Sequence, residues 1–125
     1  MDMKTIRGAT LCLPILFLGS TAQIAFAEDA TVVAPEHYKV EFENEKVRVI
    51  RITYGPGEES AMHEHAEGIV VNLTDQNTQF TLPDGTTPAV EPGPAGSISW
   101  SPAGMHAAKN LSDGPAGALL IEIKD

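Results

Sequence analysis

Short apolar segments separated by turn residues run through the chain from residue 38 to its end. Tyr38–Phe42 alternates apolar and polar positions, which predicts a strand with one buried face. Val47–Tyr54 predicts a longer strand, with Val47, Val49 and Ile52 facing inward and an irregularity near Ile50. Further short strands are expected at Gly68–Leu73, Thr78–Leu82, Ala89–Glu91, Ser97–Trp100, His106–Leu111 and Ala116–Ile123.

The separators between these segments are rich in glycine, proline, asparagine and aspartate. Asp75-Gln76-Asn77 and Ser112-Asp113-Gly114-Pro115 are typical of turns, and Pro83-Asp84-Gly85 favours a hairpin. Beyond residue 27, no long stretch repeats apolar residues at the helical period of about 3.6. Short strands at this spacing predict one all-β domain, either a sandwich or a small barrel.

The first 27 residues have a different pattern. Lys4 and Arg7 precede an apolar run from Ala9 to Gly19, and Ala25-Phe26-Ala27 has the small-x-small form that signal peptidase cleaves. The run is shorter than the roughly 20 residues that a membrane-spanning helix needs. These features predict a signal peptide, and the alternatives are an uncleaved anchor or a buried N-terminal helix.

Three segments follow from this interpretation. Residues 1–27 are the expected signal peptide, residues 28–36 a flexible tail, and residues 37–125 the single folded domain. The protein is therefore expected to be exported, to the periplasm or the medium. The only cysteine, Cys12, falls in the signal peptide, so the domain would hold no disulfide.

The charge balance excludes some partners. The whole chain has a net charge of −9. Cleavage would remove Asp2, Lys4 and Arg7, which leaves 16 acidic and 6 basic residues and a net charge of −10. Such a surface repels nucleic acids and anionic lipids, so neither is an expected partner after cleavage.

Three of the four histidines form a pattern that suits a metal ion. His63 and His65 lie two residues apart, so both point to the same face of a strand. His106 follows the turn Pro102-Ala103-Gly104-Met105 and can approach them from a second strand. Three imidazoles that converge from rigid elements are a common ligand set for first-row transition metals.

These residues resemble the two motifs of the cupins, which are small β-barrels of jelly-roll topology. The first motif reads Gly57-x5-His63-x-His65, and the second reads Gly96-x5-Pro102-x-Gly104-x-His106-x3-Asn110. The resemblance extends from about Asn44 to Lys124. It implies an all-β jelly-roll barrel that binds a divalent transition metal (Fe, Mn, Ni, Cu or Zn) through the three histidines. A homodimer is also compatible with the resemblance.

The chain departs from the cupin pattern at two positions. The usual metal-binding glutamate of the first motif is absent, because Ile69 and Val70 occupy its place. Glu67 has the same strand parity as His65 and is the candidate replacement, provided that the loop after His65 is reshaped. The second motif is one residue short before His106, so a bulge or a tighter turn must return this histidine to the inner face.

Two functions remain open at this point. The first is a metal-dependent enzyme acting on a small molecule, with dioxygenases, isomerases and lyases implied by the cupin resemblance. The second is a barrel that binds a metal or a small ligand without turnover. The sequence identifies no catalytic base and no substrate.

The residues around the motifs carry structural expectations. His37 is expected at the surface, Asn110 to support a turn or a strand, and Trp100 to fill the end of the barrel. The run Leu119-Leu120-Ile121 predicts a buried strand, after which Glu122 and Lys124 should mark the exit to water.

Overall fold

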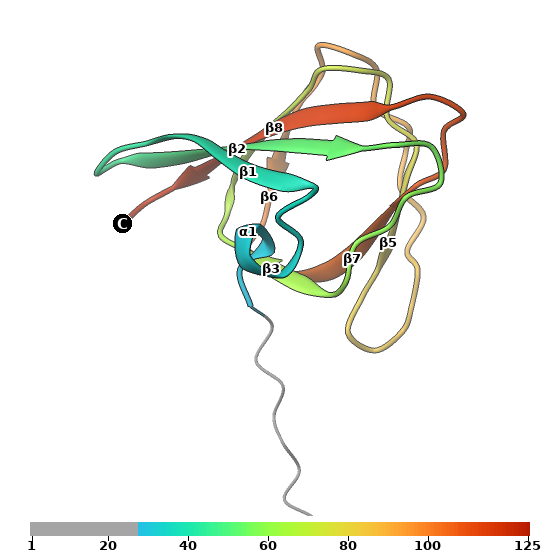
Figure 1. Cartoon of the computed structure of the whole chain (residues 1–125), viewed down its shortest axis with the longest axis horizontal. Coiled ribbons are helices and arrows are strands. Elements are labelled where there is room, and N and C mark those ends of the chain that lie inside the picture. The colour runs from blue at the N-terminus through green and yellow to red at the C-terminus, as the bar shows by residue number, and fades with distance from the viewer. Residues whose placement is uncertain (1–27) are drawn as a thin grey trace, which may run out of the picture.

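Two antiparallel sheets face each other in the computed structural model, which describes residues 28–125 (Figure 1). The expected signal peptide at residues 1–27 lies outside the described residues. The larger sheet has the strand order β1-β2-β8-β4-β6, and the smaller sheet has the order β3-β7-β5. The elements are α1 (Ala30–Val33), β1 (Tyr38–Glu43), β2 (Val47–Tyr54), β3 (His63–His65), β4 (Gly68–Asn72), β5 (Thr78–Thr81), β6 (Ile98–Ser101), β7 (Gly104–Asn110) and β8 (Ala116–Ile123).

The described residues form one domain that is mostly β, as predicted, with the short helix α1 in addition. Strands distant in the sequence lie side by side, such as β2 with β8 and β3 with β7. Among residues 28–125, only β1 and β2 pair as consecutive strands. Within the described part of the chain, no helix has the length and apolar character that crossing a membrane would require.

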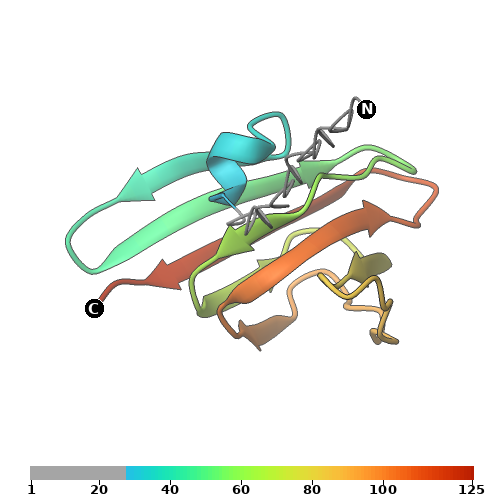
Figure 2. The same cartoon turned by 90° about the horizontal axis from the view of Figure 1, so that it is seen from below.

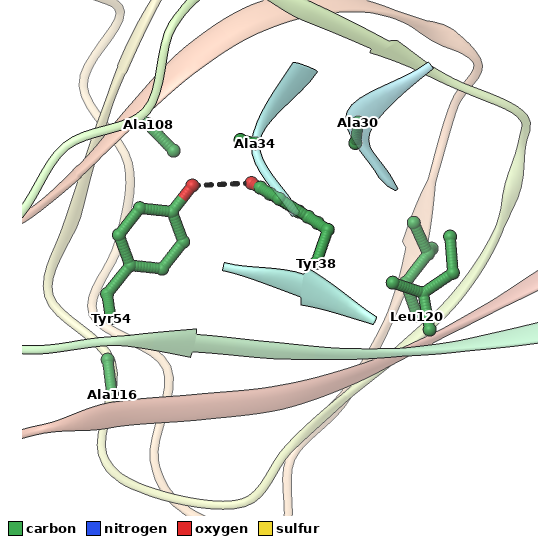
Figure 3. Packing of buried hydrophobic residues seen from close by; sticks show 8 residues of the cluster. Ala30, Ala34, Tyr38, Tyr54, Ala108, Ala116 and Leu120 are labelled. Atoms are coloured by element: carbon green, nitrogen blue, oxygen red, sulfur yellow. Dashed lines mark hydrogen bonds between the residues drawn. The ribbon is translucent and has the colours of Figure 1, made fainter. Parts of the chain in front are cut away.

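The core fills the space between the two sheets. Ile50 of β2 is fully buried and packs with Leu120 of β8 and with several alanines. Tyr38 and Tyr54 add aromatic area, and their hydroxyl groups form a 2.7 Å hydrogen bond inside the core (Figure 3). A buried phenol needs a polar partner, and each tyrosine supplies one to the other.

The inward-facing side of β2 differs from the prediction. Ile50 is buried, whereas Val47 and Val49 are half-buried on the opposite face, so only Ile52 was placed correctly. The pairing of β2 with β8 runs without interruption, and the irregularity lies instead in β1, between Val40 and Phe42. The partner strand thus absorbs the extra residue, and β2 keeps a regular alternation.

Residues 28–36 are not the expected flexible tail. Asp29 caps the short helix α1 by accepting a hydrogen bond from the Thr31 amide at 2.9 Å. Ala30 and Ala34 are each only 1% exposed. Figures 1 and 2 show α1 between β1 and β3, where it covers the gap between the edges of the two sheets. The small side chains of Ala30 and Ala34 make this close packing possible. A helix of a single turn is too short to show the repeat of apolar residues by which an amphipathic helix is predicted.

The segment after β5 also differs from the prediction. Pro83-Asp84-Gly85 forms the expected turn, in which the Gly85 amide donates to the Leu82 carbonyl at 2.8 Å. Gly85 has a φ of +85°, a conformation that favours glycine. No strand follows at Ala89–Glu91, however. The prolines at positions 88, 92 and 94 lack the amide hydrogen that a strand ladder requires, which explains the irregular course of this segment.

Candidate functional site

The three motif histidines meet on the inner face of the small sheet. His63 and His65 are buried and Glu64 between them is exposed, as strand alternation predicts. His106 pairs with His63 across the ladder between β3 and β7, so its side chain points to the same face. Because β7 begins at Gly104, directly after a two-residue link from β6, the shortened motif still delivers His106 inward.

The imidazole rings are in contact with one another. The ring centroid of His106 lies 4.9 Å from that of His63 and 4.8 Å from that of His65. The Tyr38 ring lies 4.6 Å from His63, and the Phe80 ring lies 4.6 Å from His106. The cluster therefore has aromatic walls on two sides.

Backbone carbonyls fix the orientation of two of these rings. Nδ1 of His63 lies 2.9 Å from the Ala61 carbonyl oxygen, and Nδ1 of His65 lies 3.0 Å from the Ala66 carbonyl oxygen. A carbonyl only accepts, so each Nδ1 must carry the hydrogen, and in the neutral ring Nε2 then carries the lone pair. Histidines that bind metals commonly donate their other ring nitrogen to a carbonyl in this way.

One ring nitrogen of the cluster has no partner. Nε2 of His63 is buried and makes no hydrogen bond within the described residues. A buried polar atom without a partner costs roughly 1–3 kcal/mol, so such an atom calls for an explanation. An acceptor lone pair in this position suits a ligand or a metal ion.

Two histidines of the cluster, His63 and His106, are held in the neutral form near pH 7. Burial lowers the pKa of His63 below its ordinary value. Burial also lowers the pKa of His106, to about 3, with further contributions from the neighbouring His65 and His63. The neutral form of imidazole is the form that binds a metal, so the environment favours the ligand state of these side chains.

The donor atoms nevertheless do not surround a common point. Among residues 28–125, no group of three His, Cys, Asp or Glu side chains is arranged to hold a metal ion. The rings of His63 and His106 instead meet edge to face, at an interplanar angle of 84°. The three imidazoles, the neutral form of His63 and His106, and the unpartnered Nε2 of His63 all fit a metal ion. For the three rings to converge on one ion, however, their side chains must rotate.

Glu67 lies apart from this cluster. Its side chain is exposed and it is absent from the residues that line the cavity. It lies in the link between β3 and β4, where its carbonyl accepts a hydrogen bond from the Ile123 amide at 3.0 Å. The structure thus brings three of the four predicted ligands together and leaves Glu67 outside. Val70, one of the two residues at the place of the missing glutamate, contributes to the apolar wall.

A cavity of about 760 Å³ opens between the two sheets beside the histidines. His65 and His106 line it, and its apolar wall includes Ile52, Val70 and Phe80. Among residues 28–125, Lys109 is the one cationic residue that lines the cavity. It has the opposite strand parity to His106, and its Nζ lies 3.9 Å from Oε2 of Glu59. The interior therefore offers aromatic and aliphatic surface with two imidazoles, and no ammonium or guanidinium group directed inward.

Glu122 supports the site and contradicts the expectation that it marks an exit to water. It is 3% exposed on the inner face, where it accepts a 2.6 Å hydrogen bond from Nε of Arg48. Its other oxygen accepts from the Ala66 amide at 3.1 Å, directly beside His65. In the sequence, the one local sign of this role is that Glu122 is an acidic residue in an otherwise apolar strand. Its partner Arg48 is 74 residues away, so the local sequence does not indicate the pairing.

Three other expectations have clear outcomes. Asn110 is buried and structural, as predicted, because its Nδ2 donates to the Gly55 and Gly114 carbonyls at 3.1 and 2.9 Å. His37 is buried rather than exposed, and it stacks on Tyr54 with ring centroids 4.1 Å apart. Trp100 is 56% exposed and pairs with Ile69, so it does not fill the barrel end.

Comparison with known proteins identifies the family. No family model matches the chain, and no curated protein matches it. Among solved structures, a cupin domain from Bordetella pertussis Tohama I is similar, with 30% sequence identity and a TM-score of 0.62. The match covers 70% of this chain and 92% of that one. This chain belongs to the cupin superfamily.

More distant cupins share the fold. An RmlC-like cupin with a double-stranded β-helix fold from Methanocaldococcus jannaschii has 15% identity and a TM-score of 0.54, over 70% of this chain and 78% of that one. A cupin superfamily protein from Desulfitobacterium hafniense has 17% identity and a TM-score of 0.51, over 70% and 76%. Both extend the agreement in architecture, which matches the jelly-roll prediction.

Proposed function

We propose that this cupin binds a divalent transition metal through His63, His65 and His106 and accepts a small molecule in the adjoining cavity. The observation that carries the proposal is the buried Nε2 of His63, which has no partner although its Nδ1 is anchored to a carbonyl. The same anchoring at His65 directs a second lone pair away from the backbone. Glu67 enters as a fourth ligand only if its loop moves.

The metal, when bound, would act as a Lewis acid and a template for a substrate oxygen. The chain's own residues define what that substrate can be. The apolar wall favours a mainly uncharged molecule with aromatic or aliphatic surface, and the phenol pair of Tyr38 and Tyr54 lies among the lining residues. A dioxygenase, isomerase or lyase activity belongs to this proposal. The reaction type rests on the cupin membership alone.

The second candidate is a barrel that binds a small apolar ligand without a metal. Two observations favour it: the lack of a converged ligand set among residues 28–125, and a cavity whose lining is mostly apolar. In this case the neutral imidazoles would serve as hydrogen-bond partners for an oxygen of the ligand.

Metal analysis of purified protein separates these candidates. Cells are grown with Fe, Mn, Ni, Cu or Zn, and the metal content per chain is measured by inductively coupled plasma mass spectrometry. We expect about one ion per chain in the wild type and at least a tenfold loss in His63→Ala and His106→Ala, because each removes a ligand.

His37→Ala is the matched control. His37 is also a buried histidine, but it lies outside the cluster, and its Nδ1 bonds to the Thr53 carbonyl at 2.9 Å. This variant should keep its metal. Substoichiometric metal in the wild type under every growth condition, or equal metal in all variants, would reject the metal site and leave the apolar-ligand barrel.

We also propose that residues 1–27 direct export. The n-region, the apolar run and Ala25-Phe26-Ala27 support this assignment. Expression in bacteria followed by cell fractionation and N-terminal sequencing provides the test. The expected product is an extracytoplasmic chain that begins at Glu28, and a cytoplasmic chain that retains residues 1–27 would exclude export.

A further inference from the structure

Strand β6 has its polar and apolar sides reversed. Side chains alternate along a strand, so Ser99 and Ser101 share one face of β6. Ile98 and Trp100 occupy the opposite face, where they are 69% and 56% exposed. An antiparallel sheet with one solvated face normally turns its polar side chains to water and its apolar ones to the core. The reversal calls for an explanation on the side that the serines face.

The strand pairing places the two serines on the inner side of the larger sheet. Ser99 pairs with Val70 of β4, and Val70 pairs with Leu120 of β8. Residues paired across an antiparallel ladder point to the same side, and Leu120 is buried in the core. Ser99 and Ser101 therefore face the space between the sheets, and both line the cavity of about 760 Å³.

The serines extend along the cavity from the end that holds the histidines. Two residues link Ser101 to Gly104, and Gly104 pairs with His65. Ser101 is therefore the serine nearer to the imidazoles. Ser99 lies one strand repeat farther from them, at a spacing of roughly 6.6 Å from Ser101, because a strand rises about 3.3 Å per residue.

The hydroxyl groups of these two serines are open to a ligand. Ser97, just before β6, is already engaged, because it accepts from the Asn72 side chain at 2.9 Å and donates to the Pro94 carbonyl at 2.6 Å. Within residues 28–125, the side chains of Ser99 and Ser101 form no such bonds. Ser99 is exposed and Ser101 is half-buried, so a molecule in the cavity can reach both hydroxyls. Each hydroxyl can donate one hydrogen bond and accept two.

We propose that Ser99 and Ser101 select the ligand of the cavity by forming hydrogen bonds with two oxygen atoms on one edge of an uncharged, planar molecule. This inference rests on the proposed function, because it concerns the same cavity, and it applies to the barrel with or without a metal. The spacing of the serines sets the spacing of the two oxygens. The reversed polarity of β6 is then a property of the binding site.

The chemistry of the other walls sets the class of this ligand. Phe80 lies across the cavity on the smaller sheet and offers an aromatic face, and Ile52 and Val70 add aliphatic surface. A planar ring packs well on such walls. The hydroxyls of Ser99 and Ser101 suit neutral hydroxyl or carbonyl oxygens, because a buried carboxylate or phosphate needs a cationic partner.

Isothermal titration calorimetry with two isomeric diols tests the proposal. Naphthalene-2,7-diol has both hydroxyls on one edge, at a spacing similar to that of the serines, whereas naphthalene-2,6-diol has them on opposite edges. The two isomers bury the same apolar ring, so the comparison isolates the hydrogen bonds. The wild type should bind the 2,7-isomer roughly three to ten times more tightly, because only this isomer reaches both serines and one hydrogen bond contributes a factor of this size.

Ser99→Ala and Ser101→Ala should each bind the two isomers equally, since one serine is left for either isomer. Ser112→Ala is the matched control, because Ser112 lies in the turn after β7, outside the cavity lining, and this variant should keep the preference. Circular dichroism checks the fold of all variants. Cysteine replaces alanine at position 99 or 101 if an alanine variant does not fold, because a thiol is only a weak hydrogen-bonding group.

The outcomes separate this inference from the proposed function. Equal binding of the two isomers by the wild type, or a preference that persists in either serine variant, overturns the selection by Ser99 and Ser101 and leaves the cavity as a binding site. If neither isomer binds, both the selection and the proposed small-molecule cavity are overturned. Metal content, measured on the same samples, tests the histidine site independently of both.

Discussion

At the scale of single residues, the polar groups of the interior fall into two kinds. Asn110 and the two tyrosines are satisfied, because each finds a partner among neighbouring carbonyl or hydroxyl groups. His63 is not satisfied, since its Nε2 is buried without a partner. The satisfied groups stabilise the fold, while the unsatisfied Nε2 of His63 is the observation on which the proposed binding site rests.

Asn110→Ala should destabilise the protein by about 2–4 kcal/mol, because it removes the buried donor to the Gly55 and Gly114 carbonyls and the acceptor of the Ser112 amide. Urea unfolding followed by circular dichroism measures this change. Asn44→Ala is the control, because Asn44 accepts amide hydrogens in an exposed turn and its loss should cost about 1 kcal/mol or less. Equal losses in the two variants would contradict the role assigned to Asn110.

The lowered pKa of His106 predicts a loss of stability in acid for the metal-free protein. Unfolding returns the pKa of this side chain from about 3 to its ordinary value near 6.5, so the unfolded state binds the extra proton. Stability should therefore fall as the pH drops below about 6.5, by roughly 2 kcal/mol from His106 alone between pH 7 and pH 5.

The measurement is urea unfolding in the presence of a chelator at several pH values. His106→Gln keeps the polar side chain but removes the titrating group, so its stability should change less over this range. A variant with the same pH profile as the wild type would show that His106 is not the group responsible.

At the scale of elements, a network of charged side chains joins α1 to the larger sheet and to the link after β3. Arg48 of β2 donates to Glu122 of β8 and is paired with Asp29, the cap of α1. Glu122 in turn holds the Ala66 amide in the link after β3. Burial alone would raise the pKa of Asp29, but the hydrogen bonds from Arg48 and Thr31 outweigh it and leave the pKa below its ordinary value. The helix cap, the large sheet and the loop next to His65 are therefore held together by one network.

Glu122→Gln should destabilise the fold by about 2–4 kcal/mol, because it leaves the half-buried Arg48 with only one carboxylate partner. Hydrogen exchange should also speed up at the amides of α1 and of Ala66. The matched control is Glu43→Gln, which removes an exposed carboxylate paired with Lys124 and should change stability little. If exchange at α1 and Ala66 is unchanged in Glu122→Gln, the network does not position these segments.

At the scale of the whole molecule, the two faces of the larger sheet are both apolar. The inner face closes the core and the cavity, and the opposite face exposes Phe42, Ile98 and Trp100. Burial of these side chains would favour the homodimer that is compatible with the cupin resemblance. The midpoint of thermal unfolding of a dimer rises with protein concentration, because association favours only the folded state. A hundredfold increase in concentration should therefore raise the midpoint of the wild type by several degrees, as measured by calorimetry. Ile98→Lys should show no such dependence, and a concentration-independent wild type would speak against dimerisation.

Much of the site follows from local pattern. Strand alternation alone places His63 and His65 on one face, and the spacing of glycines and prolines around His106 is sufficient to indicate the cupin fold. The turn at Pro83-Asp84-Gly85 and most strand limits are also local properties, because each depends on a few adjacent residues.

The remaining features depend on pairing between strands that are distant in the sequence. Whether Glu122 is buried depends on Arg48 and on the register of β8 with β2, and whether Trp100 faces outward depends on Ile69 of β4. A shift of one residue in either register would move these side chains to the other face. The sequence by itself therefore determined the fold class and the three histidines, whereas only the tertiary structure decided which charges are buried, which apolar face is exposed and how the imidazoles meet.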